Sequence, residues 1–357
     1  MLYRCNMCAK VFNRKKNNSN LFEQMMCKKC LQHVLKRKTT LGIGILHYKE
    51  DNDTILNTLK SIDAQIAFDF TNLEVVIVTD GGGITLDEKY INDNLKHFCP
   101  TYYYRETNGY CGGTRNTIIK KLNTDYIMFI DGDDELYSNK VLKRIYAMID
   151  KYKPDLYCST ILEELYNGKC LKYNDLNCLH MCHGKAYKKD FLIANNIVFD
   201  DTIRVSEDIG FQMWIYNLSN NIIFDYKLIS YKWKFNKASL TRNTGTDIKY
   251  DSYIRCFEPA LTELNKWFFD IPKKNKFAND TFVSMMYNIL YYRLQMTPFQ
   301  TQEMKEKYLI KYFDFVTYPN INFKLLDSLD KKLNKYLSRD IEYFSSAYKK
   351  YKRVIKN

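Results

Sequence analysis

The stretch that most constrains the fold is residues 125–135, in which an apolar run leads directly into a group of carboxylates. Five consecutive apolar or aromatic side chains are typical of a buried, parallel β-strand. Asp131, Asp133 and Asp134 follow at once, and like charges that close repel one another and are costly to remove from water. A divalent cation removes that cost, because hard ions such as Mg²⁺ and Mn²⁺ take carboxylate oxygens. The stretch therefore indicates either a metal site that holds a diphosphate or a solvated acidic loop that caps a helix.

Strand-like and helix-like segments alternate on the N-terminal side of this stretch. Residues 41–46 and 73–78 are short apolar runs typical of buried strands, and residues 102–104 predict a third short strand. Between the first two strands, apolar residues recur at helical spacing from Ile55 to Ile66. This alternation predicts an α/β fold with a mostly parallel sheet and helices on both faces.

Three further polar motifs lie where such a fold binds ligands. Residues 79–83 place a carboxylate and then glycines at the end of the second strand, and glycine lets the backbone approach a ligand closely. Residues 109–116 form a glycine-rich turn that enters a helix with Arg115 in its first turns, an arrangement that suits an anion. Glu207 and Asp208 precede an apolar helical pattern, where carboxylates either carry chemistry or cap the helix.

Taken in chain order, these motifs resemble the inverting family 2 glycosyltransferases of the GT-A fold, over about residues 40–242. That family's Asp-x-Asp-Asp motif is present as residues 131–134, and its Glu-Asp motif is present as residues 207–208. Its motif of small residues followed by Ala-Arg-Asn is similar to residues 113–116, Gly-Thr-Arg-Asn. Residues 231–242 look like the family's late segment that begins with Tyr and ends in Ser-Leu-Thr-Arg.

At two strand ends the sequence departs from the family pattern. The first strand of the family usually ends in Pro-x-Tyr-Asn, where this chain has His47, Tyr48 and Lys49. The second strand usually ends in Asp-Asp-Gly-Ser, where Thr79 replaces the first Asp and Asp80 matches the second. These departures raise the hypothesis of a decayed, non-catalytic site.

The resemblance implies displacement at the anomeric carbon of a nucleotide-sugar, with Mn²⁺ or Mg²⁺ neutralising the charge that develops on the leaving diphosphate. It implies Asp208 as the general base that takes the proton of the acceptor hydroxyl, with Glu207 helping to orient the acceptor. The other implied residues are the donor contacts Tyr48, Glu50, Asp80, Gly81, Arg115, Asp131 and Gly132, the metal ligands Asp131 and Asp133, and the acceptor contacts His183 and Asp134.

His183 lies in a segment whose composition has two interpretations. Cys178, His180, Cys182 and His183 are close enough in sequence to form a second metal site. The alternative is a buried core segment that contains one functional histidine, because the spacing would require all the ligands of a metal site from a single turn.

The N-terminal region predicts a structural zinc module over residues 1–38. Cys5 and Cys8, and then Cys27 and Cys30, form two Cys-x-x-Cys pairs at the spacing of a four-thiolate zinc site, as in zinc-ribbon-like or treble-clef-like modules. A segment this short buries little apolar surface, so zinc would supply most of its folding free energy.

Basic residues are concentrated at the two ends of the chain. Residues 1–38 hold ten Lys and Arg against one Glu, and residues 331–357 hold nine Lys and Arg against two acids, whereas the formal charge of the whole chain is +13. The ends therefore indicate either an anionic partner, such as a nucleic acid, or ordinary solubilising charge.

We expect three regions: the zinc module at 1–38, a GT-A domain at 39–245 and a helical region at 246–357. The expected function is metal-dependent transfer from a UDP-sugar to a hydroxyl of a glycan or surface polymer. The alternatives are transfer to modified bases in DNA, and a non-catalytic zinc-containing protein that binds nucleic acid. The odd cysteine count of 11, with no export signal or membrane span, predicts a reducing, cytoplasmic location.

Overall fold

The computed structural model describes residues 2–4, 11–13, 38–173, 180–202, 207–236, 303, 306 and 309. Near the N-terminus, strands β1 (Leu2–Arg4) and β2 (Val11–Asn13) pair in antiparallel fashion. The four predicted zinc ligands, Cys5, Cys8, Cys27 and Cys30, lie outside the described residues, as does the predicted helical region apart from the three isolated positions, which are helical.

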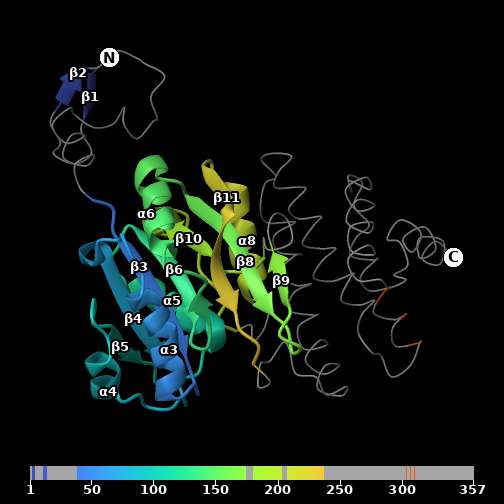
Figure 1. The fold of residues 1–357 in the computed structure, drawn as a ribbon. Coiled ribbons are helices and arrows are strands. Elements are labelled where there is room, and N and C mark those ends of the chain that lie inside the picture. Colours follow the sequence, from blue (N-terminus) through green and yellow to red (C-terminus); the bar gives the residue numbers. More distant parts are fainter. Residues whose placement is uncertain are drawn as a thin grey trace.

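A nine-stranded mixed sheet forms the centre of the described chain (Figure 1). The strands are β3 (Leu41–His47), β4 (Leu73–Thr79), β5 (Thr101–Tyr104), β6 (Tyr126–Asp131), β7 (Glu135–Leu136), β8 (Leu156–Glu164), β9 (Cys170–Tyr173), β10 (Lys185–Lys188) and β11 (Ile222–Trp233). Their order is β5-β4-β3-β6-β10-β8-β11-β7, with β9 paired to β8.

The sheet is mixed rather than mostly parallel. The pairs among β5, β4, β3 and β6 are parallel, as predicted. β10, however, is antiparallel to both β6 and β8, and β9 and β7 are antiparallel to their partners. The sequence analysis did not predict β7, β9 or β10. β8 turns directly back into β9 through a tight turn in place of a helical crossover, which makes that pair antiparallel.

Helices cover both faces of the sheet, as predicted (Figure 1). Helices α3 (Asn52–Asp63), α4 (Glu88–Asp93) and α6 (Val141–Tyr152) share one apolar core with the strands, whereas α5 (Tyr110–Lys121) and α8 (Glu207–Leu218) lie on the opposite face. The short elements η1 (Phe70–Asn72) and α7 (Lys189–Ala194) complete the set. None of the helices in the described ranges combines the length and the apolarity that crossing a bilayer requires.

Glycines in β3 let α5 pack closely against the sheet. A Cβ atom on Gly44 would lie 2.1 Å from Cγ2 of Ile118, and a Cβ atom on Gly42 would lie 2.5 Å from Oγ1 of Thr124. The neighbouring residues of β3 point the other way into the core beneath α3 and α6. The alternation of side chains along a strand therefore divides β3 into a glycine face for α5 and an apolar face for the main core.

The strand order places a ligand crevice between β3 and β6. The chain runs from β3 to β4 to β5 in one direction and then continues at β6 on the other side of β3. In open α/β sheets, ligands bind outside the carboxyl ends of the strands at such a reversal. The segments that follow β3 and β6, residues 48–50 and 132–134, therefore border the predicted crevice.

The packing of α5 on β3 predicts that Gly44→Ala destabilises the fold by about 1–3 kcal/mol, because the added methyl group overpacks the contact with Ile118. Ile118→Ala alone should also destabilise, by about 2–5 kcal/mol. The double variant should lose less than the sum of the two single losses, since each change makes room for the other. Chemical denaturation of the four proteins measures this coupling. Additive losses would contradict the proposed contact.

Candidate active site

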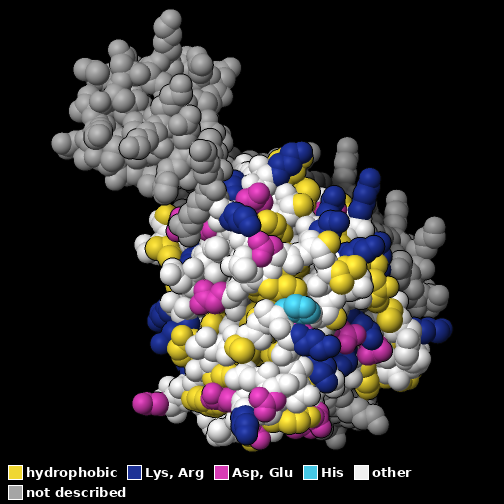
Figure 2. Space-filling view, turned by 60° about the vertical axis from the view of Figure 1, so that its left-hand side comes forward, with side chains coloured by type: hydrophobic (Ala, Val, Ile, Leu, Met, Phe, Trp, Pro, Cys, Tyr) yellow, Lys and Arg dark blue, Asp and Glu magenta, His cyan; other side chains and the backbone are white. Residues whose placement is uncertain are grey.

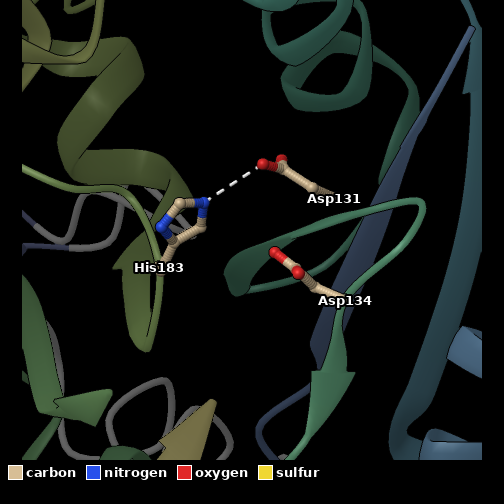
Figure 3. Close-up of side chains that lie close together, drawn as sticks. All are labelled: Asp131, Asp134 and His183. Carbon is tan, nitrogen blue, oxygen red and sulfur yellow. Dashed lines mark hydrogen bonds and ion pairs between the residues drawn. The ribbon is translucent and has the colours of Figure 1, made fainter. Parts of the chain in front are cut away.

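Three metal-binding side chains meet at the end of β6. Among the described residues, Asp131, Asp134 and His183 each offer a ligand atom, and these atoms all lie within 4.8 Å of one another. Figure 3 shows the imidazole of His183 pointing toward the carboxylate of Asp131, with the carboxylate of Asp134 beside them. Two carboxylates and an imidazole form a donor set that suits a divalent ion such as Mn²⁺.

Asp131 is held between two cationic or proton-donating groups. Its Oδ2 lies 3.2 Å from Nε2 of His183, and its Oδ1 lies 3.3 Å from Nη2 of Arg115. Burial by itself would raise the pKa of Asp131, but the hydrogen bond and charge of His183 and the charge of Arg115 outweigh it, so the pKa lies below its ordinary value. Asp131 is therefore ionised at neutral pH.

Asp134 is almost completely buried, with 1% of its surface exposed. Its Oδ2 accepts a hydrogen bond from the hydroxyl of Tyr231 at 2.6 Å, and its Oδ1 accepts one from the backbone N–H of Lys234 at 2.8 Å. Burial, followed by the charges of Asp131 and Asp133, nevertheless raises the pKa of Asp134 well above its ordinary value. A cation beside Asp131 and Asp134 would offset this repulsion, so the group fits a metal ion.

His183 is presented by a tight turn just before β10. Gly184, the next residue, has φ +65°, and a Cβ atom there would lie 2.7 Å from Ile161, so the turn requires glycine. The His183 ring stacks on Tyr231, with centroids 4.7 Å apart, and leans on Trp233. Its Nδ1 is buried without a hydrogen-bond partner, whereas Nε2 faces Asp131. The packing therefore orients Nε2, the atom available as a ligand, toward the carboxylates.

Arg115 links this group to helix α8. It is 4% exposed, its Nη1 donates a hydrogen bond to Oε1 of Glu207, and its Nη2 pairs with Asp131. The guanidinium also lies over the ring of Phe199, 5.5 Å from the centroid. Arg115 thus connects three elements, α5, α8 and β6. Both of its terminal nitrogens already contact carboxylates, although the sequence analysis expected a contact with the donor.

Glu207 and Asp208 form the first turn of α8. Glu207 is buried against Arg115, while Asp208 is partly exposed. Burial is the largest cause of the raised pKa of the Cys111 thiol, and the charges of Glu207, Asp131 and Asp208 raise it further. Burial is also the largest cause of the raised pKa of Cys182, the residue before His183, and the charge of Asp208 adds to it. These effects place the Asp208 carboxylate in the same charged neighbourhood as Asp131 and His183.

Asp133, the expected second metal ligand, does not belong to the group of ligand atoms found among the described residues. Its Oδ2 accepts a hydrogen bond from Nδ2 of Asn236 at 2.7 Å. Asp134, which the sequence analysis assigned to the acceptor, takes the place beside Asp131. The alternation of side chains along a strand does not show which carboxylate beyond its end points inward. That depends on the turn in which the N–H of Asp134 donates a hydrogen bond to the carbonyl oxygen of Asp131.

The sequence analysis did not give a role to Tyr231 or Asn236. Tyr231 is fully buried, and its hydroxyl accepts a hydrogen bond from the N–H of Asp131 while donating one to Asp134. The signal for it was its place at the start of the segment that resembles the family's late Tyr segment.

In the segment 178–183, Cys182 is buried against Gln212 and Cys178 lies outside the described residues, so His183 is the member that joins this site.

The expected donor contacts lie at the ends of β3 and β4. Glu50 Oε2 accepts hydrogen bonds from the N–H groups of Tyr48 and Lys49 at 2.8 and 3.2 Å. Asp80 accepts one from the N–H of Gly109 at 3.0 Å and pairs with Nε of Arg105 at 3.0 Å, so its carboxylate braces the neighbouring loop.

Two glycines bring these segments close together. A Cβ atom on Gly81 would lie 2.2 Å from the backbone of Thr107, and one on Gly132 would lie 2.7 Å from the carbonyl oxygen of Leu46 and 3.4 Å from Cγ of Glu50. The turn that contains Glu50 therefore lies directly against Gly132, the residue between Asp131 and Asp133.

Comparisons with known proteins identify similar glycosyltransferases. Residues 43–203 match the family model for glycosyl transferase family 2. An uncharacterised glycosyltransferase of Rickettsia prowazekii is 25% identical over 225 residues, which is 58% of this chain and 68% of that protein. The poly(ribitol-phosphate) β-N-acetylglucosaminyltransferase TarS of Staphylococcus aureus is 29% identical over 185 residues, which is 47% of this chain and 30% of TarS.

Solved structures share the fold. Residues 1–349 of TarS in complex with UDP-GlcNAc superpose with a TM-score of 0.60 at 16% identity, covering 88% of this chain and 92% of that chain. A mannosyltransferase from Pyrobaculum calidifontis in complex with GDP-Man and Mn²⁺ gives a TM-score of 0.55 at 13% identity, covering 90% and 87%. Over residues 43–203 the chain therefore matches a glycosyltransferase family 2 domain, and together with the glycosyltransferase relatives this match indicates a transferase enzyme.

Proposed function

We propose that the protein is a metal-dependent, inverting glycosyltransferase that moves a sugar from a nucleotide-sugar, with UDP as the nucleotide, to a hydroxyl group. The observation that carries the proposal is the joining of Asp131, Asp134 and His183 to Glu207 through Arg115, at the crevice between β3 and β6. Isolated acidic loops occur in many proteins. A buried arginine that connects such a loop to a second carboxylate pair is expected of a built site.

The donor would lie along the ends of β3, β4 and β6. A divalent ion held by Asp131, Asp134 and His183, with Mn²⁺ as the best match to the imidazole, would supply positive charge to the leaving diphosphate. Tyr48, Glu50, Asp80, Gly81 and Gly132 would shape the nucleoside side of the crevice. The named ligands of TarS and of the Pyrobaculum enzyme support a nucleotide-sugar, and the sequence similarity to TarS favours UDP.

Asp208 is the general base of the proposal. The acceptor oxygen would form a bond to the anomeric carbon as its proton passes to Asp208 and the bond from that carbon to the diphosphate breaks. Asp208 is partly exposed at the start of α8, whereas Glu207 beside it is buried against Arg115. Glu207 would therefore fix the position of Asp208, and not contact the acceptor directly.

For the acceptor, we propose a glycan or another polymer that carries hydroxyl groups, which is the kind of acceptor that the name of TarS describes for that enzyme. Transfer to DNA stays a prediction, as do the boundaries of the three expected regions. Among the described residues on the face shown in Figure 2, basic and acidic side chains are interspersed. The intact group around Asp131 favours catalysis over a decayed binding protein.

The proposal predicts that nucleotide release from UDP-GlcNAc or another UDP-sugar requires Mn²⁺ and depends on Asp208. Asp208→Asn should lower turnover by about 10²–10⁴-fold, because the amide cannot accept the acceptor proton, while leaving the affinity for UDP and Mn²⁺ nearly unchanged. Asp190→Asn is a matched control, since Asp190 is an exposed acid in the first turn of α7. Nucleotide release and calorimetry measure the two effects. Full turnover by Asp208→Asn would remove Asp208 from the mechanism.

A second prediction concerns Tyr231, whose hydroxyl holds Asp134 and the backbone of Asp131. Tyr231→Phe should keep the ring against His183 but weaken Mn²⁺ binding by about tenfold, as is typical when a partner of a metal ligand is removed. Tyr157→Phe is the control, because Tyr157 is equally buried and its hydroxyl donates to Asp225, a residue outside the ligand group. Calorimetric titration with Mn²⁺ and thermal unfolding distinguish the two. Equal Mn²⁺ affinities in both variants would contradict the role of Tyr231.

A further inference from the structure

His47 and Thr79 lie at the two strand ends where the sequence departs from the family pattern, and they contact each other. They are register partners at the carboxyl ends of the parallel strands β3 and β4. Nδ1 of His47 lies 2.8 Å from Oγ1 of Thr79, and both residues are buried. Two residues that are 32 positions apart in the sequence are therefore the two halves of one hydrogen bond.

The second ring nitrogen of His47 determines the direction of that bond. Nε2 lies 2.9 Å from the carbonyl oxygen of Glu50. A carbonyl oxygen only accepts, so Nε2 carries the proton and donates, and Nδ1 is left to accept from the hydroxyl of Thr79. Burial lowers the pKa of His47, which favours this neutral form. One imidazole thus joins the end of β4 to the turn after β3.

These two contacts hold together the loops on one side of the crevice. The turn at Glu50 lies against Gly132 at the end of β6, and the N–H of Asp80 donates to the carbonyl oxygen of His47 at 2.9 Å. The N–H of Ile84, beyond the glycines of the β4 loop, donates to the carbonyl oxygen of Tyr48 at 2.8 Å. The bond between His47 and Thr79 therefore joins the same two loops that these backbone hydrogen bonds hold together.

We propose that His47 and Thr79 form a positioning clasp that holds the nucleotide-binding side of the crevice in its working shape. The inference rests on the proposed function, because it assumes that a nucleotide occupies this crevice. The clasp acts through the loops at Tyr48–Glu50 and Asp80–Gly81, and neither side chain is exposed enough to be the main contact with a ligand.

The test measures calorimetric affinity for UDP and for GDP in the presence of Mn²⁺, and for Mn²⁺ alone, in the full chain. Thr79→Val removes the hydroxyl but keeps the shape, and His47→Gln keeps a donor near Glu50 but removes the Nδ1 acceptor. Each should weaken binding of the preferred nucleotide by about fivefold, the usual effect of losing one hydrogen bond, with unchanged affinity for Mn²⁺ alone. Thr79→Ser should bind within about twofold of the native chain. The double variant should bind the nucleotide no more weakly than His47→Gln alone, because both changes remove the same hydrogen bond.

Thr160→Val is the matched control. Thr160 is fully buried and its hydroxyl donates to the carbonyl oxygen of Tyr226 at 3.1 Å, so the change removes an equivalent bond outside the crevice. It should lower the melting temperature about as much as Thr79→Val does, with native nucleotide affinity. The clasp is overturned if Thr79→Val binds nucleotide like the native chain, if the two single effects simply add, or if Thr160→Val is equally impaired. A native chain that binds neither UDP nor GDP would overturn the proposed function as well, whereas native binding with unaffected variants overturns the clasp alone.

Discussion

The buried ion pairs of Arg115 are the interaction on which the rest of the site depends. One guanidinium, with almost no exposure, pairs with Glu207 and with Asp131. Removing one partner from such a buried group leaves uncompensated charge and typically costs about 3–5 kcal/mol. The planar fork of arginine reaches two carboxylates at once, which a lysine ammonium does not reproduce. The first turn of α8 is therefore fixed against the end of β6 by electrostatics as well as by packing.

The distribution of charge around this arginine explains why the region is suited to a cation. Asp131, Asp133, Asp134, Glu207 and Asp208 lie near one another at the end of a buried strand and the start of a helix. The opposing groups are Arg115, the imidazole of His183 and neutral donors such as the hydroxyl of Tyr231. Asp134 shows the imbalance most clearly, because its pKa is raised although two hydrogen bonds stabilise its ionised form. A divalent ion is the simplest remedy, and the proposed reaction uses the same charge to stabilise a leaving diphosphate.

The sequence predicted the parts of this molecule that follow from local pattern. The buried run at 126–130, the parallel strands β3, β4 and β6, and the helices on both faces were anticipated from alternation and spacing. The family resemblance singled out the motifs from which the candidate site is built. The mixed half of the sheet was not predicted, because β9 and β10 are four residues long each and offer little local pattern.

Within the site, long-range contacts were the part that sequence could not provide. Asp131 is 52 residues from His183, and Tyr231 is 97 residues from Asp134. Nothing in the local pattern distinguishes the inward carboxylate Asp134 from its neighbour Asp133. The bond between His47 and Thr79 likewise appears only when the register of β3 and β4 is known. The sequence predicted polar residues at each strand end, but the residues that they contact belong to other segments of the chain.

The most direct test of the account is anomalous diffraction from a crystal of the protein soaked with Mn²⁺ and UDP. The account predicts a Mn²⁺ anomalous peak within coordination distance of Asp131, Asp134 and His183, with the diphosphate beside it in the crevice between β3 and β6. Mn²⁺ bound away from these three residues, or a diphosphate bound with His183 turned away from the ion, would contradict it.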